Sequence, residues 1–128
     1  MPVEWRRLSR DAGWSVSTNG EITVVLGAGR QHRVFVDPST GTDLIRLWAV
    51  AGQRSDLNTL ADPPHVTAWK RNRQSDLVGF KIDPRGKLIG EAWVPTAGLN
   101  AEEWAFWVRT VAQVCDRIEY LLTGTDNN

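Results

Sequence analysis

The feature that most constrains this fold is a series of short apolar runs, rich in β-branched residues, that stop at tight-turn signals. Asn19 followed by Gly20 is the strongest of these signals, because both central positions of a two-residue hairpin turn favour positive φ. Each connection between neighbouring runs is short enough for a hairpin. The sequence therefore predicts a four-stranded antiparallel meander, with strands at Trp14–Thr18, Glu21–Leu26, Gln31–Asp37 and Leu44–Val50.

Helices are predicted at both ends and in the middle of the chain. A short amphipathic helix is expected over Pro2–Asp11, and a second begins at Pro63 and Pro64, since proline suits a first helical turn. Residues 52–62 read as irregular or partly helical. A further hairpin is expected from Leu77–Asp83 and Lys87–Val94. Because the strands are antiparallel and the helices are segregated from them, the fold class is α+β, with about six strands in the sheet.

The last helix is predicted from Asn100, its N-cap, to about Leu122. At 100° per residue its apolar side chains form one stripe, which is wide enough to pack on one face of the sheet. Small residues in the facing strand, Gly90 and Ala92, would admit a close helix. The stripe consists of Trp104, Trp107, Val108, Val111, Cys115, Ile118 and Leu122.

The size and composition indicate one globular domain. A chain of 128 residues with 41% hydrophobic and 23% charged residues is expected to form a single domain over residues 1–122, followed by a flexible tail over 123–128. Fifteen basic residues balance fifteen acidic ones, which argues against phosphate backbones or anionic lipids as the main ligand. No apolar run is long enough for a membrane span, so we expect a cytoplasmic protein.

Two-residue alternation sorts the strand residues onto two faces. The face away from the last helix is expected to carry four large apolar side chains among charged ones. Seven tryptophans are many for this length, and an aromatic face open to water is typical of an interface. The alternative is that residues 52–62 or the first helix cover these rings. The candidate partner-binding residues are Phe35, Trp48, Ile89 and Trp93, with Arg33 and Arg46 at the rim.

The chain shows no recognisable catalytic or metal-binding motif. The single cysteine, Cys115, lies on the apolar stripe of the last helix and reads as a small core residue. The two histidines, His32 and His65, have no partner at a ligand-like spacing. We therefore predict no enzyme activity, no catalytic residue, no metal and no cofactor.

A second candidate site is the densest basic run, which follows an aromatic residue. Trp69, Lys70, Arg71 and Arg73 lie in the predicted middle helix and could contact nucleic acid. The more ordinary interpretation is a solvated helix face, because so few cations give little phosphate-binding energy at physiological salt. Nucleic acid is therefore the alternative ligand, and a protein partner the expected one.

The chain resembles the YbjN family of bacterial proteins, which share the type III secretion chaperone-like fold, over most of its length, including the first helix and the meander. The resemblance rests on residues 69–73 and 77–83, the turn at Gly86, the strand ending at Pro95, residues 98–102 and the long final helix. Within these, Asn72, Gly79, Leu99 and Glu102 match the family pattern in position.

The resemblance implies a small non-enzymatic module that dimerises and binds other proteins. Relatives among secretion chaperones hold extended client segments on hydrophobic patches. Together with the aromatic sheet face, this leads to the hypothesis of a chaperone-like adaptor that binds a partner protein, self-associates, or does both.

Overall fold

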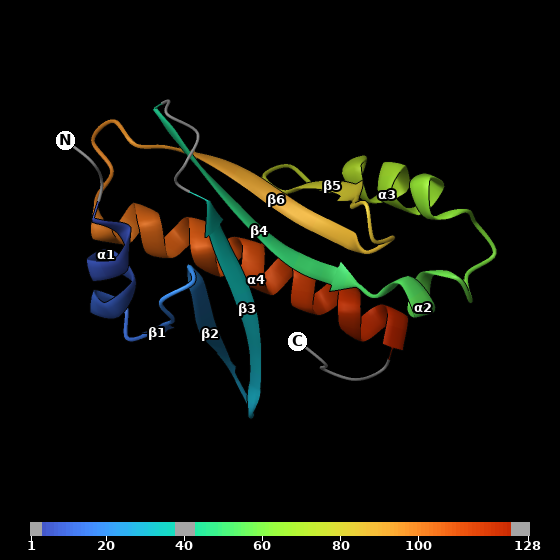
Figure 1. The fold of residues 1–128 in the computed structure, drawn as a ribbon, viewed down its shortest axis with the longest axis horizontal. Coiled ribbons are helices and arrows are strands. Elements are labelled where there is room, and N and C mark those ends of the chain that lie inside the picture. The colour runs from blue at the N-terminus through green and yellow to red at the C-terminus, as the bar shows by residue number, and fades with distance from the viewer. Residues whose placement is uncertain (1–3, 38–42, 124–128) are drawn as a thin grey trace.

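The computed structural model describes residues 4–37 and 43–123, which form an α+β fold (Figure 1). The helices are α1 (Trp5–Asp11), α2 (Arg54–Leu57), α3 (Pro64–Asn72) and α4 (Ala101–Thr123). The strands are β1 (Ser15–Val16), β2 (Glu21–Gly27), β3 (Arg30–Asp37), β4 (Leu44–Gly52), β5 (Gly79–Ile82) and β6 (Leu88–Pro95). The predicted class and the order of elements are confirmed, and the partly helical stretch contains α2.

All six strands form one antiparallel sheet in the order β1-β2-β3-β4-β6-β5. The first four make the predicted meander, and the β5–β6 hairpin joins it through β6. Strand β6 pairs with β4 along its length, from Leu44 opposite Pro95 to Gly52 opposite Leu88. Strand β5 is thereby placed at the edge.

Gly20 in the β1–β2 turn occupies a position that requires glycine. Gly20 has φ +86°, and a Cβ there would lie 3.2 Å from the carbonyl oxygen of Val36. The amide of Ser17 closes the turn by donating to the carbonyl of Glu21 at 2.8 Å, and the amide of Val36 in β3 donates to the carbonyl of Gly20 at 2.9 Å. The β1–β2 hairpin is therefore held against β3 as well as within itself.

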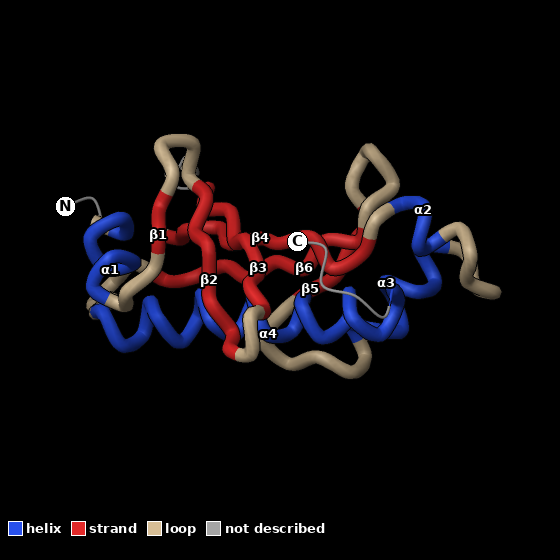
Figure 2. The backbone as a smooth tube through the Cα atoms, turned by 90° about the horizontal axis from the view of Figure 1, so that it is seen from below, coloured by secondary structure: helices blue, strands red, loops and turns tan. Residues whose placement is uncertain are grey.

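Helix α4 lies along one face of the sheet and forms the centre of the core (Figure 2). Most of the predicted stripe is buried, including Trp104, Val108 and Cys115. Trp107 and Leu122 are partly buried and pack against this core from its border. Trp107 lies at the side of the stripe, where its ring packs edge-on against Phe106, with centroids 6.0 Å apart.

Close approach of α4 depends on Gly90 in β6. A Cβ at Gly90 would lie 3.0 Å from Val78 Cγ1 and 3.1 Å from Phe80 Cε1, and it would overlap Cys115 Sγ. The prediction that a small residue here admits the helix is confirmed. Cys115 and Gly90 therefore occupy one shared volume between the helix and the sheet.

Helix α1 is fastened to α4 by a buried polar contact. Trp104 Nε1 donates to Ser9 Oγ at 2.8 Å, and Ser9 Oγ donates to the carbonyl of Trp5 at 2.7 Å. The rings of Trp5 and Trp104 lie 6.3 Å apart. A buried indole N–H with a partner avoids the cost of an unsatisfied donor.

The ends of the chain lie largely outside the described residues. Thr123, the first residue of the predicted tail, is the last residue of α4. The rest of that predicted tail, and the start of the predicted first helix, fall outside the described ranges. Among the helices described, none combines the length and apolar character needed to span a membrane.

Candidate functional site

The sheet face opposite α4, here called the outer face, carries no helix in the described part of the chain. Helix α1 packs against α4 and β1, α2 against α4, and α3 against β5. Figure 2 shows α1 and α3 beside α4 rather than across the other side of the strands. The sequence left open that the first helix or residues 52–62 cover the aromatic rings. The positions of α1 and α2 exclude this for these two helices.

Two of the predicted rings form a stacked pair on the outer face. Phe35 in β3 lies directly opposite Trp48 in β4, and their centroids are 4.3 Å apart with planes inclined by 16°. Both side chains are partly exposed. Cross-strand aromatic pairs of this kind stabilise a sheet beyond their buried area, so the pair is also a rigid surface feature.

The third ring, Trp93 in β6, is the most accessible. It lies opposite Arg46 in the register, and 46% of its surface is exposed. Strand β5 pairs with β6 only as far as Glu91, so Trp93 has a strand neighbour on the β4 side alone, and exposing an indole to this extent is costly unless something covers it. Trp93 is therefore the strongest single sign of a contact surface.

Ile89 differs from the prediction. It lies on the outer face, but only 2% of its surface is exposed. The register places it between Val50 in β4 and Lys81 in β5, so neighbours on both sides exclude water. Ile89 is part of the floor of the outer face, and the expectation that it is an exposed anchor was wrong.

The charged side chains of the outer face are largely paired at its centre. Arg46 Nε lies 2.6 Å from Glu91 Oε2, and Lys81 Nζ lies 3.3 Å from the same oxygen. The guanidinium of Arg46 also lies 5.6 Å from the ring centroid of Trp48. Arg33, nearly half exposed, reaches Glu21 Oε1 at 3.4 Å. The two predicted rim arginines thus flank the stacked rings.

A cavity of about 460 Å³ opens on this face beside the stacked rings. Its walls come from β3, β4 and the β5–β6 turn, which brings together residues far apart in the sequence. It is lined by Arg33, Phe35, Trp48, Val50, Asp83, Arg85 and Lys87. The turn itself was expected between the last two strands, but its place beside the stacked rings was not. Periodicity sorts strand residues onto faces and does not show on which face a turn packs.

The basic run in α3 is arranged differently. Trp69 is 57% exposed, and the guanidinium of Arg73 lies 5.0 Å from its ring centroid. Lys70 Nζ is paired with Asp62 Oδ2 at 2.6 Å. Arg71 instead lines a groove of about 510 Å³ between α3, β5 and α4. The four residues therefore do not form one unpaired cationic surface.

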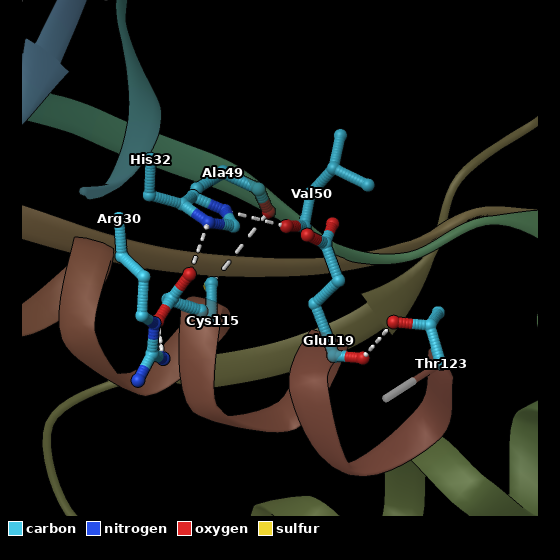
Figure 3. A network of polar contacts seen from close by, with 8 residues as sticks. Arg30, His32, Ala49, Val50, Cys115, Glu119 and Thr123 are labelled. Carbon is cyan, nitrogen blue, oxygen red and sulfur yellow. Dashed lines mark hydrogen bonds and ion pairs between the residues drawn. The ribbon is translucent and has the colours of Figure 1, made fainter. Parts of the chain in front are cut away.

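A buried polar network under α4 was missed at the sequence level (Figure 3). Arg30 is paired with Asp116, whose Oδ1 lies 3.6 Å from His32 Nδ1. The other ring nitrogen of His32, Nε2, lies 2.8 Å from the carbonyl oxygen of Val50. His32 and Asp116 are 0% and 2% exposed, whereas 42% of the Arg30 side chain is exposed, so the network runs from the core to the surface.

Cys115 and Glu119 lie next to this network on α4 (Figure 3). Cys115 is fully buried, and burial is the main reason why the pKa of its thiol rises to about 12. A thiol that stays protonated at neutral pH is a poor nucleophile. Among residues 4–37 and 43–123, no three His, Cys, Asp or Glu side chains are grouped so that they could hold a metal ion.

Comparison with solved structures first defines the class. The fold is similar to a chain in the structure of the HopA1–SchA chaperone–effector complex, with a TM-score of 0.58 and 8% identity over 88% of each chain. It is also similar to the crystal structure of E. coli YbjN, a "putative transcription regulator", with a TM-score of 0.59. That match has 17% identity and covers 91% of this chain and 84% of that one. At these identities the likeness establishes a shared chaperone-like fold.

The sequence then identifies the family. The YbjN family, described as "Putative bacterial sensory transduction regulator", matches residues 6–120. The chain belongs to the YbjN family, as its sequence pattern indicated. No curated protein matches the chain in sequence.

Proposed function

We propose that this chain is a non-enzymatic, chaperone-like adaptor that holds a segment of a partner protein on the outer face of its sheet. The observation that carries the proposal is the exposed indole of Trp93 beside the Phe35–Trp48 stack, on a face without a helix in the described part of the chain. Rigid aromatic side chains in a depression are typical of the centre of a protein interface.

The similar structures support a protein as the ligand. One of them is a complex between a chaperone and an effector, and the fold that it shares with this chain extends over most of both chains. A second copy of the chain is one possible partner, because the same surface on two copies can form a two-fold interface.

The location of the titratable groups supports a non-enzymatic role. The histidine, carboxylate and thiol that lie nearest one another, His32, Asp116 and Cys115, are at most 2% exposed. A substrate on the surface does not reach them. The accessible part of the outer face instead offers aromatic rings and paired charges, which suit binding.

The first test is site-specific photo-crosslinking in the native cell. A photoreactive phenylalanine analogue replaces Trp93 in one variant and Trp69 in another; both indoles are about half exposed, but they lie on different surfaces. We expect one discrete crosslinked protein at position 93, and we expect that this protein is not crosslinked at position 69. Equal products at both positions would contradict the proposal.

The second test removes the rings themselves. Trp48→Ala combined with Trp93→Ala should abolish the crosslinked complex or the dimer, whereas Trp69→Ala should leave it intact. Circular dichroism checks that the double variant is folded, and sedimentation velocity separates a dimer from a partner complex. If binding survives in the folded double variant, the outer face is not the site. Loss of the complex on nuclease treatment would favour the α3 alternative instead.

A further inference from the structure

The cavity on the outer face has an uneven charge. Its floor is apolar, formed by Phe35, Trp48 and Val50, and its remaining lining residues are three cations and one carboxylate. We call this cavity the basic basin. At the centre of the outer face Arg46 and Lys81 share the single carboxylate of Glu91, which leaves one positive charge there, whereas the basin carries an excess of two.

The one carboxylate of the basin is engaged by the turn. Asp83 Oδ1 accepts hydrogen bonds from the backbone amides of Arg85 at 2.9 Å and Lys87 at 2.8 Å. A side chain that caps its own turn in this way is held in place by the backbone. The turn therefore positions Arg85 and Lys87 at the basin. The nearest carboxylate, that of Asp83, is hydrogen-bonded to the backbone of the turn and not to the side chains of these two residues.

The turn carries two cations, Arg85 and Lys87. Neither Arg85 nor Lys87 forms an ion pair with a described residue. Arg54 at the start of α2 adds a third positive charge, because a Cβ on Gly86 would lie 2.9 Å from its Cδ and 3.4 Å from its Nε. Three cations thus gather at a single turn in a chain whose net charge is zero.

We propose that the basic basin takes an acidic segment of the partner, in which an aspartate or glutamate lies close to a large apolar side chain. The apolar side chain would rest on the Phe35–Trp48 stack, and the carboxylates would lie among Arg54, Arg85 and Lys87. This inference rests on the proposed function and specifies the chemistry of the partner. Complementary charge of this kind selects partners and speeds their association.

The arrangement favours a peptide over a nucleic acid. Bases bound to a sheet stack on free aromatic faces. Here Phe35 already covers one face of Trp48, and Arg46 lies over the same indole. The stacked pair is suited to an aliphatic or aromatic side chain that packs on its edges, next to a charged group.

The experiment uses the full chain and three synthetic peptides of equal length and equal apolar content. Their charged positions carry glutamate, lysine or serine, and binding is measured by fluorescence anisotropy at low salt. We expect the glutamate peptide to bind, and the lysine and serine peptides to bind at least about tenfold more weakly. Equal binding of the three peptides, or no binding of the glutamate peptide up to about millimolar concentration, would overturn the inference.

Charge reversal locates the contact. Arg85→Glu combined with Lys87→Glu should weaken binding of the glutamate peptide about tenfold or more, and raised salt should reduce the difference. The matched control, Arg7→Glu with Arg117→Glu, reverses two exposed cations on α1 and α4 and should change binding less than about twofold. Equal effects of the two pairs, or tighter binding of oligothymidylate than of the peptide, would overturn the inference.

The two proposals fail in different ways. One outcome is that Trp48→Ala with Trp93→Ala abolishes binding of the natural partner while the charge reversal at 85 and 87 leaves it unchanged. In that case the outer face is the binding site, and the inference of an acidic partner segment is wrong. If neither pair of substitutions affects the natural partner, both proposals are wrong.

Discussion

At the scale of single residues, the contact between Gly90 and Cys115 sets how closely α4 approaches the sheet. The sulfur lies where a side chain at position 90 would have to go, and Val78 and Phe80 close the same space from the side. Protein interiors are packed too tightly to absorb an added methyl group at such a point. The glycine is therefore required by packing and not by backbone conformation.

Gly90→Ala should destabilise the protein by about 1–3 kcal/mol through overpacking. Gly79→Ala is the matched control, because a Cβ at Gly79 would approach nothing more closely than 4.0 Å. Urea unfolding followed by tryptophan fluorescence measures both. Adding Cys115→Ala should recover part of the loss caused by Gly90→Ala; strictly additive effects of the two substitutions would contradict a shared volume.

Burial of Cys115 also predicts how stability depends on pH. Its thiol pKa rises from 9.0 to about 12 in the folded protein, chiefly because burial penalises the thiolate. Since the unfolded chain then loses its proton first, stability contributed by the protonated thiol is complete below pH 9.0 and falls as the pH rises towards about 12. The slope is roughly 1.4 kcal/mol per pH unit.

The measurement is the difference in unfolding free energy between the wild type and Cys115→Ala, at about pH 8 and about pH 10.5. Every other titrating group is common to the two proteins, so the difference isolates the thiol. We expect the advantage of the wild type to shrink at the higher pH. A constant difference would show that the thiol ionises as easily in the folded state as in the unfolded one.

At the scale of elements, Asn72 joins the end of α3 to the edge of the sheet. Its Nδ2 donates to the carbonyl of Phe80 at 2.9 Å, and its Oδ1 accepts from the amide of Phe80 at 2.5 Å. The side chain thus pairs with β5 as a neighbouring strand would. This gives a physical reason for an asparagine at the position that matched the family pattern.

Asn72→Ala should cost roughly 1–3 kcal/mol, because two hydrogen bonds are lost at about 0.5–1.5 kcal/mol each. The amide of Phe80 should exchange with solvent much faster in the variant, which hydrogen exchange by NMR detects. Asn58→Ala, at the exposed C-terminal end of α2, is the control and should leave this amide unchanged. Unchanged protection of Phe80 in Asn72→Ala would refute the role of the side chain.

Most elements could be predicted from local signals. Turn residues such as Asn19 and Gly20 fix hairpins, and 3.6-residue periodicity fixes α4, because both depend on neighbours in the sequence. The pairing of β4 with β6 depends on contacts between distant residues. Boundaries also moved, as for the predicted strand at Trp14–Thr18, of which Ser15–Val16 is paired in the sheet.

The candidate site was predictable in part. Two-residue alternation placed Phe35, Trp48 and Trp93 on the correct face. It does not report solvent exposure, which depends on neighbouring strands, and Ile89 is buried for that reason. Nor does it reveal that Asp116, a charged residue of a helix, is buried by its contacts with Arg30 and His32 from another element.

At the scale of the whole molecule, one core connects nearly all of the described elements. Helix α4 contacts β2, β3, β4 and β6 in the sheet, as well as α1 and α2. The hydrophobic core cluster draws residues from β2, β3, β4 and β6 together with α4, so these strands share the packing of that helix. Unfolding is therefore expected to be one cooperative event.

This predicts coincident unfolding curves from two independent signals. Tryptophan fluorescence reports on tertiary packing and far-ultraviolet circular dichroism on secondary structure, and both should give the same midpoint in urea within error. Trp93→Ala should keep the curves coincident, since that indole is half exposed. A fluorescence change that precedes the loss of helix would contradict a single core.

The edges of the sheet limit how copies of this chain can assemble. One edge is β1, which has only two residues, and the other is β5, where α3 packs and Asn72 occupies the backbone of Phe80. Long open edges allow strands of successive molecules to add without end, as in fibrils. Strand β1 pairs only with Ile22 and Thr23 of β2, and β5 pairs with β6 only from Leu88 to Glu91, so the edge that stays open is short on each side. Two copies that met through the outer face would cover the same surface on each other, so such an assembly would close as a dimer instead of growing into a filament.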